Sequence, residues 1–313
     1  MPTAQPDRAP GKVNGIRERR CSVQVACGSF PTHTPHPIFC GMKFGTCNEY
    51  FENWPLEEVF DYAAQVGYQG VEIAPFTLAD SVEEISPSRR KEIRSAAAAA
   101  GVDIIGLHWL LISPKGLYTN HVDDEIRNRT RDYFKALVKF CGDIGGRVMI
   151  VGSPQQRTVK DDWDYGETWN RTRAVFEDCL TLCERNDVSI CIEPLSKDQT
   201  NFITTAKEAR KMVEEIDHPS FQMMVDVCSG STEEVPVADL LDIAGPHLYH
   251  VHVNDANKRG PGFGQTDFVS VLRRLKEMAY DRYVSVEVFD FEPDPRTIAS
   301  GSLKYLQGIS QLL

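Results

Sequence analysis

From Met42 to the end of the chain, short apolar stretches alternate with longer segments in which apolar residues recur at helical spacing. The apolar stretches are rich in valine, isoleucine and aromatic residues, which is typical of strands. The segments between them repeat with a period near 3.6, which is typical of amphipathic helices. The expected strands span residues 43–47, 70–76, 102–111, 147–154, 188–196, 221–227, 248–255 and 282–289.

Proline and glycine delimit several of the expected helices. Pro55 opens the first helix and Gly67 closes it, which is the usual asymmetry of helix ends. The second helix, 86–101, begins with Ser86 as a cap and ends at a glycine. Longer helices are expected over 123–142 and 166–185, and a helical segment follows each of the last four strands, the final one ending near Leu313.

Eight strand and helix pairs in about 270 residues favour an α/β fold made of a single (β/α)8 TIM barrel. A doubly wound open sheet also alternates strands and helices. Its strands are covered on both faces and read as almost entirely apolar. Here residues 188–193 place valine and isoleucines on one face and Ser189, Cys191 and Glu193 on the other. A polar inner face that ends at an open mouth fits the barrel better.

The first 41 residues lack this periodicity and are rich in proline, glycine, threonine and arginine. We expect residues 1–41 to form a disordered N-terminal tail, since they hold too few apolar residues for a core. The order of their parts does not match a secretory signal. The catalytic domain is therefore expected to be the barrel of residues 42–313.

Composition and charge exclude some classes of binding partner. The formal net charge of −11 opposes binding to a phosphate backbone, so nucleic acid is not an expected partner. No stretch approaches the roughly 18 apolar residues of a membrane span, so no membrane association is expected. Nine cysteines without a CxxC pair indicate buried reduced thiols and a cytoplasmic location.

Chemistry-bearing residues stand near the C-terminal ends of four consecutive expected strands, where barrel enzymes place their active sites. Three carboxylates that converge there repel one another unless they are protonated or a cation neutralises them. A divalent ion meets this need, and oxygen ligands with one nitrogen suit Mn²⁺, Mg²⁺ or Co²⁺. The alternative is four unrelated polar residues in ion pairs or loop caps. The four residues are Glu193, Asp226, His252 and Glu287.

The same positions resemble a known family. EPLS at Glu193, VD at Asp226, HVHVND at His252, NKRGPGFG at 257–264 and VEVF at Glu287 resemble the xylose-isomerase-like barrel superfamily, and within it the ketose 3-epimerases. The resemblance covers nearly all of 42–313. It implies that the four residues bind one divalent metal, usually manganese. It also implies that Glu193 and Glu287 exchange protons with the substrate.

The substrate contacts match the family less well than the metal ligands do. The resemblance implies that Gln199, Ser229 and Lys258 touch the substrate, where family members commonly have glutamate, histidine and arginine. Arg259 stands beside Lys258, and the resemblance makes Phe289 an aromatic wall of the pocket.

Two further strand ends face the expected mouth. Glu72 and His108 are candidate sugar contacts there, although each has an alternative role in holding the rim or the core. His250 lies one layer deeper than His252, so we expect it to support the site and not to bind the metal.

The leading hypothesis is a divalent-metal-dependent sugar isomerase or epimerase that transfers a proton through an enediolate. A dehydratase acting on a keto-sugar or keto-inositol begins with the same proton abstraction and stays an alternative. An apurinic endonuclease needs three metals and a basic DNA-binding face, which the charge disfavours. A metal-binding barrel without catalysis gives no reason for two carboxylates to flank the metal. The sequence fixes neither the sugar and its phosphorylation nor whether the chain forms a homo-oligomer.

Overall fold

A computed structural model of the chain describes residues 42–313. The expected tail of residues 1–41 lies outside the described residues. Within 42–313, no helix is long and apolar enough to cross a membrane.

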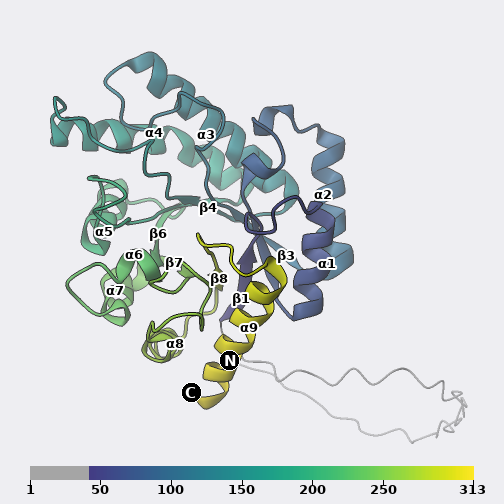
Figure 1. The fold of residues 1–313 in the computed structure, drawn as a ribbon. Coiled ribbons are helices and arrows are strands. Elements are labelled where there is room, and N and C mark those ends of the chain that lie inside the picture. The colour runs from purple at the N-terminus through teal and green to yellow at the C-terminus, as the bar shows by residue number, and fades with distance from the viewer. Residues whose placement is uncertain (1–41) are drawn as a thin grey trace, which may run out of the picture. The chain divides into compact units, whose positions relative to one another are not determined.

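The strands form one closed parallel barrel in which each strand pairs with its neighbours in chain order, and β1 pairs with β8 (Figure 1). Closure confirms the expected (β/α)8 barrel and excludes the open sheet. Each observed strand lies within its expected range. The strands are β1 (Lys43–Cys47), β2 (Gly70–Ile73), β3 (Asp103–Leu107), β4 (Val148–Val151), β5 (Ser189–Ile192), β6 (Phe221–Asp226), β7 (Leu248–Val253) and β8 (Tyr283–Val286).

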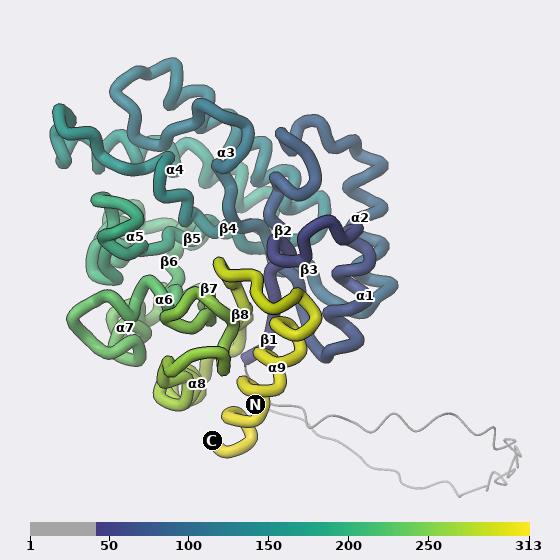
Figure 2. Tube along the Cα trace, viewed as in Figure 1, coloured from purple at the N-terminus to yellow at the C-terminus, as the bar shows by residue number. Residues whose placement is uncertain are grey.

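The helices surround the strands, and the last helix packs beside the first (Figure 2). The loop after β6 carries an additional short helix, α6, that the sequence pattern did not predict. The other helices follow the expected segments. They are α1 (Leu56–Val66), α2 (Pro87–Ala100), α3 (Asp124–Ile144), α4 (Tyr165–Asn186), α5 (Ala206–Ile216), α6 (Val227–Gly230), α7 (Val237–Ala244), α8 (Phe268–Glu277) and α9 (Pro295–Leu312).

The helix ends follow the predicted capping chemistry. The Ser86 hydroxyl accepts a hydrogen bond from the Arg89 N–H at the start of α2. Gly67 closes α1 with a left-handed backbone, φ 109°, where a side chain would be strained. Pro55 differs slightly from its expected place, because it caps α1 and Leu56 is the first helical residue.

Two apolar layers follow from the alternation along the strands. Most buried apolar residues form one large cluster between the strands and the helices. A second cluster fills the barrel interior and consists of Ile105, Val148, Ile150, Cys191 and Met224. The cysteines of the described region are free, and all but Cys228 are buried, as expected for reduced thiols. The polar residues of the inner face therefore lie above an apolar floor.

Candidate metal and proton-transfer centre

The four residues at the ends of the last four strands converge on one small volume. Asp226 on β6 lies opposite His252 on β7 in the strand register, and Glu193 and Glu287 follow β5 and β8 directly. One ligand atom from each of the four lies within 4.8 Å of the others. All four side chains are buried. This geometry could hold one metal ion with four protein ligands.

The pKa shifts of the three carboxyls also indicate a place for a cation. Burial, together with Glu287 and Asp226, raises the pKa of Glu193. Burial and Glu287 likewise raise the pKa of Asp226. Burial opposes ionisation of Glu287 too, but His252 and His108 outweigh it and lower the pKa of Glu287. A cation among these oxygens would replace the protons that the carboxyls otherwise retain.

Two buried atoms without a hydrogen-bond partner lie where a cation would fit. With His252 Nε2 donating to Glu72 Oε2 at 3.1 Å, Nδ1 of a neutral ring would carry the free lone pair. That Nδ1 approaches Glu287 Oε2 to 2.9 Å, yet neither buried atom has a hydrogen-bond partner. Two acceptors without a donor between them are unfavourable in a low-dielectric interior. A metal ion would be the partner of both.

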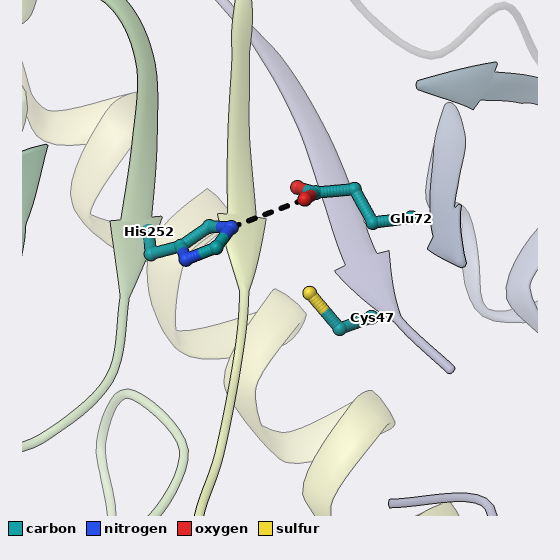
Figure 3. Close-up of side chains that lie close together, drawn as sticks. All are labelled: Cys47, Glu72 and His252. Carbon is teal, nitrogen blue, oxygen red and sulfur yellow. Dashed lines mark hydrogen bonds and ion pairs between the residues drawn. The ribbon is translucent and has the colours of Figure 1, made fainter. Parts of the chain in front are cut away.

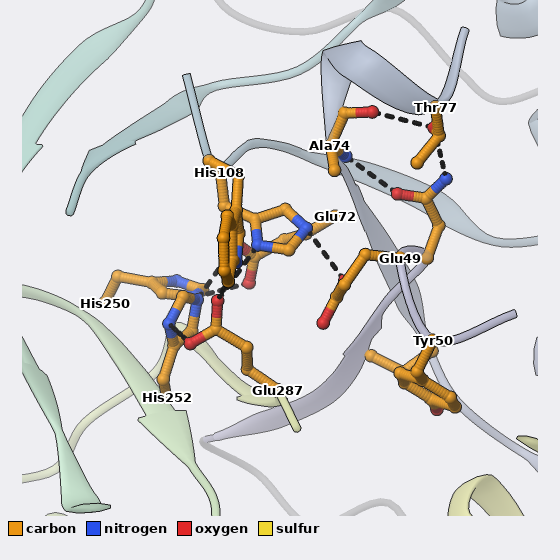
Figure 4. Close-up of polar contacts among 12 residues, drawn as sticks. Glu49, Tyr50, Glu72, Ala74, Thr77, His108, His250, His252 and Glu287 are labelled. Carbon is orange, nitrogen blue, oxygen red and sulfur yellow. Dashed lines mark hydrogen bonds and ion pairs between the residues drawn. The ribbon is translucent and has the colours of Figure 1, made fainter. Parts of the chain in front are cut away.

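Glu72 holds the histidine ligand in place from behind. Its other oxygen accepts from His250 Nε2 at 2.6 Å, so one carboxylate orients two imidazoles (Figure 4). Glu72 is fully buried, and both histidines hold its pKa well below the usual range although burial opposes ionisation. Of the two roles considered for Glu72, a sugar contact and a support of the rim, these contacts favour the supporting one. His250 has the supporting position expected of it.

Replacing Glu72 with glutamine should weaken metal binding. The amide has only one acceptor atom, so it cannot accept from both histidines, and the orientation of His252 is lost. Losing such a supporting carboxylate is expected to lower metal affinity by about 10- to 100-fold. Calorimetric titration of the purified variant with Mn²⁺ measures the effect. A variant with unchanged metal affinity and a raised KM would instead return Glu72 to a substrate-binding role.

The Asp226 carboxylate is fixed by hydrogen bonds to both of its oxygens. The Ser229 N–H donates to Oδ1 at 2.6 Å, because Asp226 caps the short helix α6. Asn254 Nδ2 donates to Oδ2 at 2.8 Å, and its own carbonyl oxygen accepts from the Cys228 N–H at 2.9 Å. Asn254 thus orients a metal ligand, a role the sequence analysis did not assign to it.

Glu287 is held on its other oxygen by two side chains from the end of β3. Trp109 Nε1 donates to Glu287 Oε1 at 2.9 Å, and His108 Nδ1 lies 3.1 Å from the same atom. The far nitrogen of His108 lies 3.1 Å from Oε2 of Glu49 (Figure 4). Glu49 was also missed from the sequence. Glu49 lies in the turn after β1, two residues past Cys47, where strand alternation no longer applies.

Glu193 has its carboxylate against the backbone of β4. A β-carbon placed on Gly152 would lie 1.7 Å from Glu193 Oε2. Glycine at the end of β4 therefore leaves the space that this metal ligand occupies. The sequence pattern places Gly152 in an expected strand and assigns it no role in the site. The contact shows that its missing side chain makes room for the Glu193 carboxylate.

A cavity of about 300 Å³ opens directly over Glu193 and Glu287. A second cavity of about 280 Å³ adjoins it through Gln199 and Phe289. Of the expected substrate contacts, His108, Gln199 and Phe289 line the first cavity, and Ser229 and Lys258 line the second. Arg259 lines neither, because its Nε donates to Asp290 at 2.8 Å. The expectation that Arg259 holds substrate is not supported by this position.

Comparison with known proteins agrees with the geometry. Residues 60–309 match the family model of the xylose isomerase-like TIM barrel. Among curated relatives, the D-psicose 3-epimerase of Ruminiclostridium cellulolyticum is 24% identical over 79% of this chain and 84% of its own length. The 3-dehydro-D-guloside 4-epimerase of Escherichia coli K12 is 25% identical over 85% and 99%, and the fructoselysine 3-epimerase of Shigella flexneri is 21% identical over 86% and 98%.

Solved structures share the fold. The crystal structure of a D-psicose 3-epimerase in the presence of D-fructose superimposes with a TM-score of 0.73 at 19% identity, covering 84% of this chain and 90% of that one. The 3-keto-D-glucoside 4-epimerase of E. coli in its apo form gives a TM-score of 0.75 at 22% identity, covering 85% and 99%.

Proposed function

Because the chain belongs to the xylose isomerase-like TIM barrel family, we propose that it is a divalent-metal-dependent sugar epimerase. One observation carries the proposal: Glu193 and Glu287 come from non-adjacent strands, share the candidate metal centre and line the same cavity. Epimerisation needs two groups that exchange protons with one carbon from its two faces.

The metal ligands would be Glu193, Asp226, His252 and Glu287. Oxygen-rich donors with one nitrogen suit Mn²⁺, and Mg²⁺ or Co²⁺ would also fit. When bound, such an ion supplies a Lewis acid that polarises a carbonyl and stabilises negative charge on the neighbouring oxygens.

The two glutamates are the proton-transfer pair. Without a bound metal, burial and the neighbouring carboxylates raise the pKa of Glu193, whereas His252 and His108 lower that of Glu287 although burial opposes it, so Glu193 is the more readily protonated of the two. Glu287 removes the proton from the carbon beside the carbonyl, and Glu193 delivers a proton to the opposite face. The carbon is inverted, and the glutamates exchange roles in the reverse reaction.

The substrate is a keto-sugar that carries a substituent. Two of the relatives are named for substituted sugars, 3-dehydro-D-guloside and fructoselysine. The cavity lined by Ser229 and Lys258 extends beyond the proton-transfer pair and offers room for such a group. A glycoside, phosphate or cyclic keto-sugar is accordingly expected to react at least as readily as a free ketohexose.

Turnover in D₂O tests the reaction. The full-length chain with Mn²⁺ is incubated with free ketoses, keto-glycosides, sugar phosphates and keto-inositols, and products are analysed by NMR and mass spectrometry. Proton exchange through the glutamates should place one solvent deuterium at the inverted carbon. An epimer without deuterium at that carbon contradicts exchange through the two glutamates. A product lighter by one water supports the dehydratase alternative.

A further inference from the structure

A second group of potential metal ligands lies on the other side of Glu287. Cys47 is the last residue of β1, Glu49 lies in the turn that follows, and His108 directly follows β3. One ligand atom from each of the three lies within 4.8 Å of the others, and all three side chains are buried. Cys47 also lies beside Glu72 and His252, so the second group adjoins the first (Figure 3).

The second group has the same orphaned atoms as the first. Both carboxylate oxygens of Glu49 and Nε2 of His108 are buried without a hydrogen-bond partner, although Glu49 Oε2 and His108 Nε2 are only 3.1 Å apart. His108 Nδ1 lies 3.1 Å from Glu287 Oε1, so the lone pair of a neutral ring would be on Nε2. This repeats the arrangement of His252, in which a carboxylate fixes one ring nitrogen and the other faces an acceptor.

We propose that Cys47, Glu49 and His108 form a second cation site, which takes a zinc-type ion. One thiolate and one carboxylate balance a double positive charge, and sulfur, oxygen and nitrogen from three residues leave a fourth position open for water. Zinc binds such atoms at about 2.0–2.3 Å. The ligand atoms then lie about 3.3–3.8 Å apart. Glu49 Oε2 and His108 Nε2 are already 3.1 Å apart, and the other pairs lie within 4.8 Å, so small side-chain adjustments would suffice.

The two sites differ in the metals that they select. The first offers three carboxylates and one imidazole, which suit hard ions such as Mn²⁺ or Mg²⁺. The second offers a thiolate, which suits Zn²⁺ or Co²⁺. Cavities adjoin the buried second site on two sides, because Glu49 lines a groove of about 800 Å³ and His108 lines the smaller cavity over the glutamate pair.

An ion pair without a metal is the alternative to the second cation site. A protonated His108 between Glu49 and Glu287 would balance the local charge by itself, and burial does not prevent this, since the two carboxylates raise the pKa of His108 to about 10. That ion pair involves no sulfur. The two arrangements are therefore distinguished by whether Cys47 binds a metal.

Titration with Co²⁺ tests directly whether the Cys47 sulfur binds a metal. The full-length protein, stripped of metal and titrated with Co²⁺, should bind two ions and develop a thiolate-to-cobalt charge-transfer band in the near ultraviolet. Cys47→Ser should lose the band and one of the two ions. The matched control Cys191→Ser, which alters a buried cysteine of the barrel floor, should keep both. Glu193→Gln should lose the first ion and keep the band.

A further variant leaves the sulfur in place. Glu49→Gln should raise the Co²⁺ concentration at which the band appears by about tenfold or more, because it removes an anionic ligand. Circular dichroism confirms that each variant is folded. Binding of one Co²⁺ without the band, or a band that persists in Cys47→Ser, overturns the second site. Neither outcome depends on epimerase activity, so the proposed function can fail or stand separately.

Discussion

Replacing Glu193 with glutamine is expected to abolish metal binding and turnover together. Glutamine keeps the volume of the side chain but supplies no anionic ligand and cannot exchange a proton. The loss of a positioned acid or base alone lowers turnover by about 10²- to 10⁴-fold. His252→Ala should have the same double effect, since it removes the nitrogen ligand and leaves Glu287 Oε2 without its neighbour.

Metal content and activity must be measured on the same preparations. Wild-type protein that has been dialysed against Mn²⁺ should retain about one ion per chain at the first site, and both variants should retain almost none. Glu184→Gln and His218→Ala are the matched controls, because these two residues pair at 3.4 Å on the protein surface. Full metal retention in Glu193→Gln and His252→Ala would contradict the four-ligand centre.

The barrel and the convergence of its four candidate metal ligands were predictable because strand alternation has a period of two. A polar residue at the C-terminal end of one inner face is expected to meet its counterpart on the next strand. Asp226 and His252 do so in register. The same rule placed Glu193 and Glu287 at the mouth, and the resemblance to sugar epimerases added the proposal that they transfer protons.

The depth of each inner-face side chain in the barrel, and the residues that it contacts, were not predictable in the same way. Alternation indicates that Glu72 points inward, but not that two histidines from β7 lie close enough to take both of its oxygens. Arg259 was expected at the substrate, yet Asp290 from the loop after β8 pairs with it. Both are contacts between segments far apart in sequence, which periodicity does not describe.

The role of Gly152 could not be predicted from the sequence pattern. In the sequence it stands between Val151 and Ser153, where a loop glycine is unremarkable. Only the neighbouring strand shows that Glu193 fills the place of its missing side chain. Gly152 does not adopt the left-handed backbone that favours glycine, so space and not conformation restricts this position.

Gly152→Ala is therefore expected to disable the centre without unfolding the protein. The new β-carbon would lie 1.7 Å from Glu193 Oε2 and 2.9 Å from its Cδ, and the end of a flexible side chain is what must move. The barrel tolerates this, but the carboxylate leaves the ligand position. Displacing a reacting group by about 1 Å can lower turnover by about 10²-fold, and we expect at least that loss here, together with weaker Mn²⁺ binding.

The comparison with Glu193→Gln identifies the cause. If Gly152→Ala acts only by displacing Glu193, the double variant should lose little more activity or metal affinity than Glu193→Gln alone, because the two changes remove the same interaction. Gly308→Ala is the matched control, since a β-carbon at that position in α9 meets nothing within 4 Å. It should leave turnover unchanged, and the thermal midpoint should not fall. Additive losses in the double variant, or a large drop in the midpoint of Gly152→Ala, would show that Gly152 serves the barrel and not the ligand.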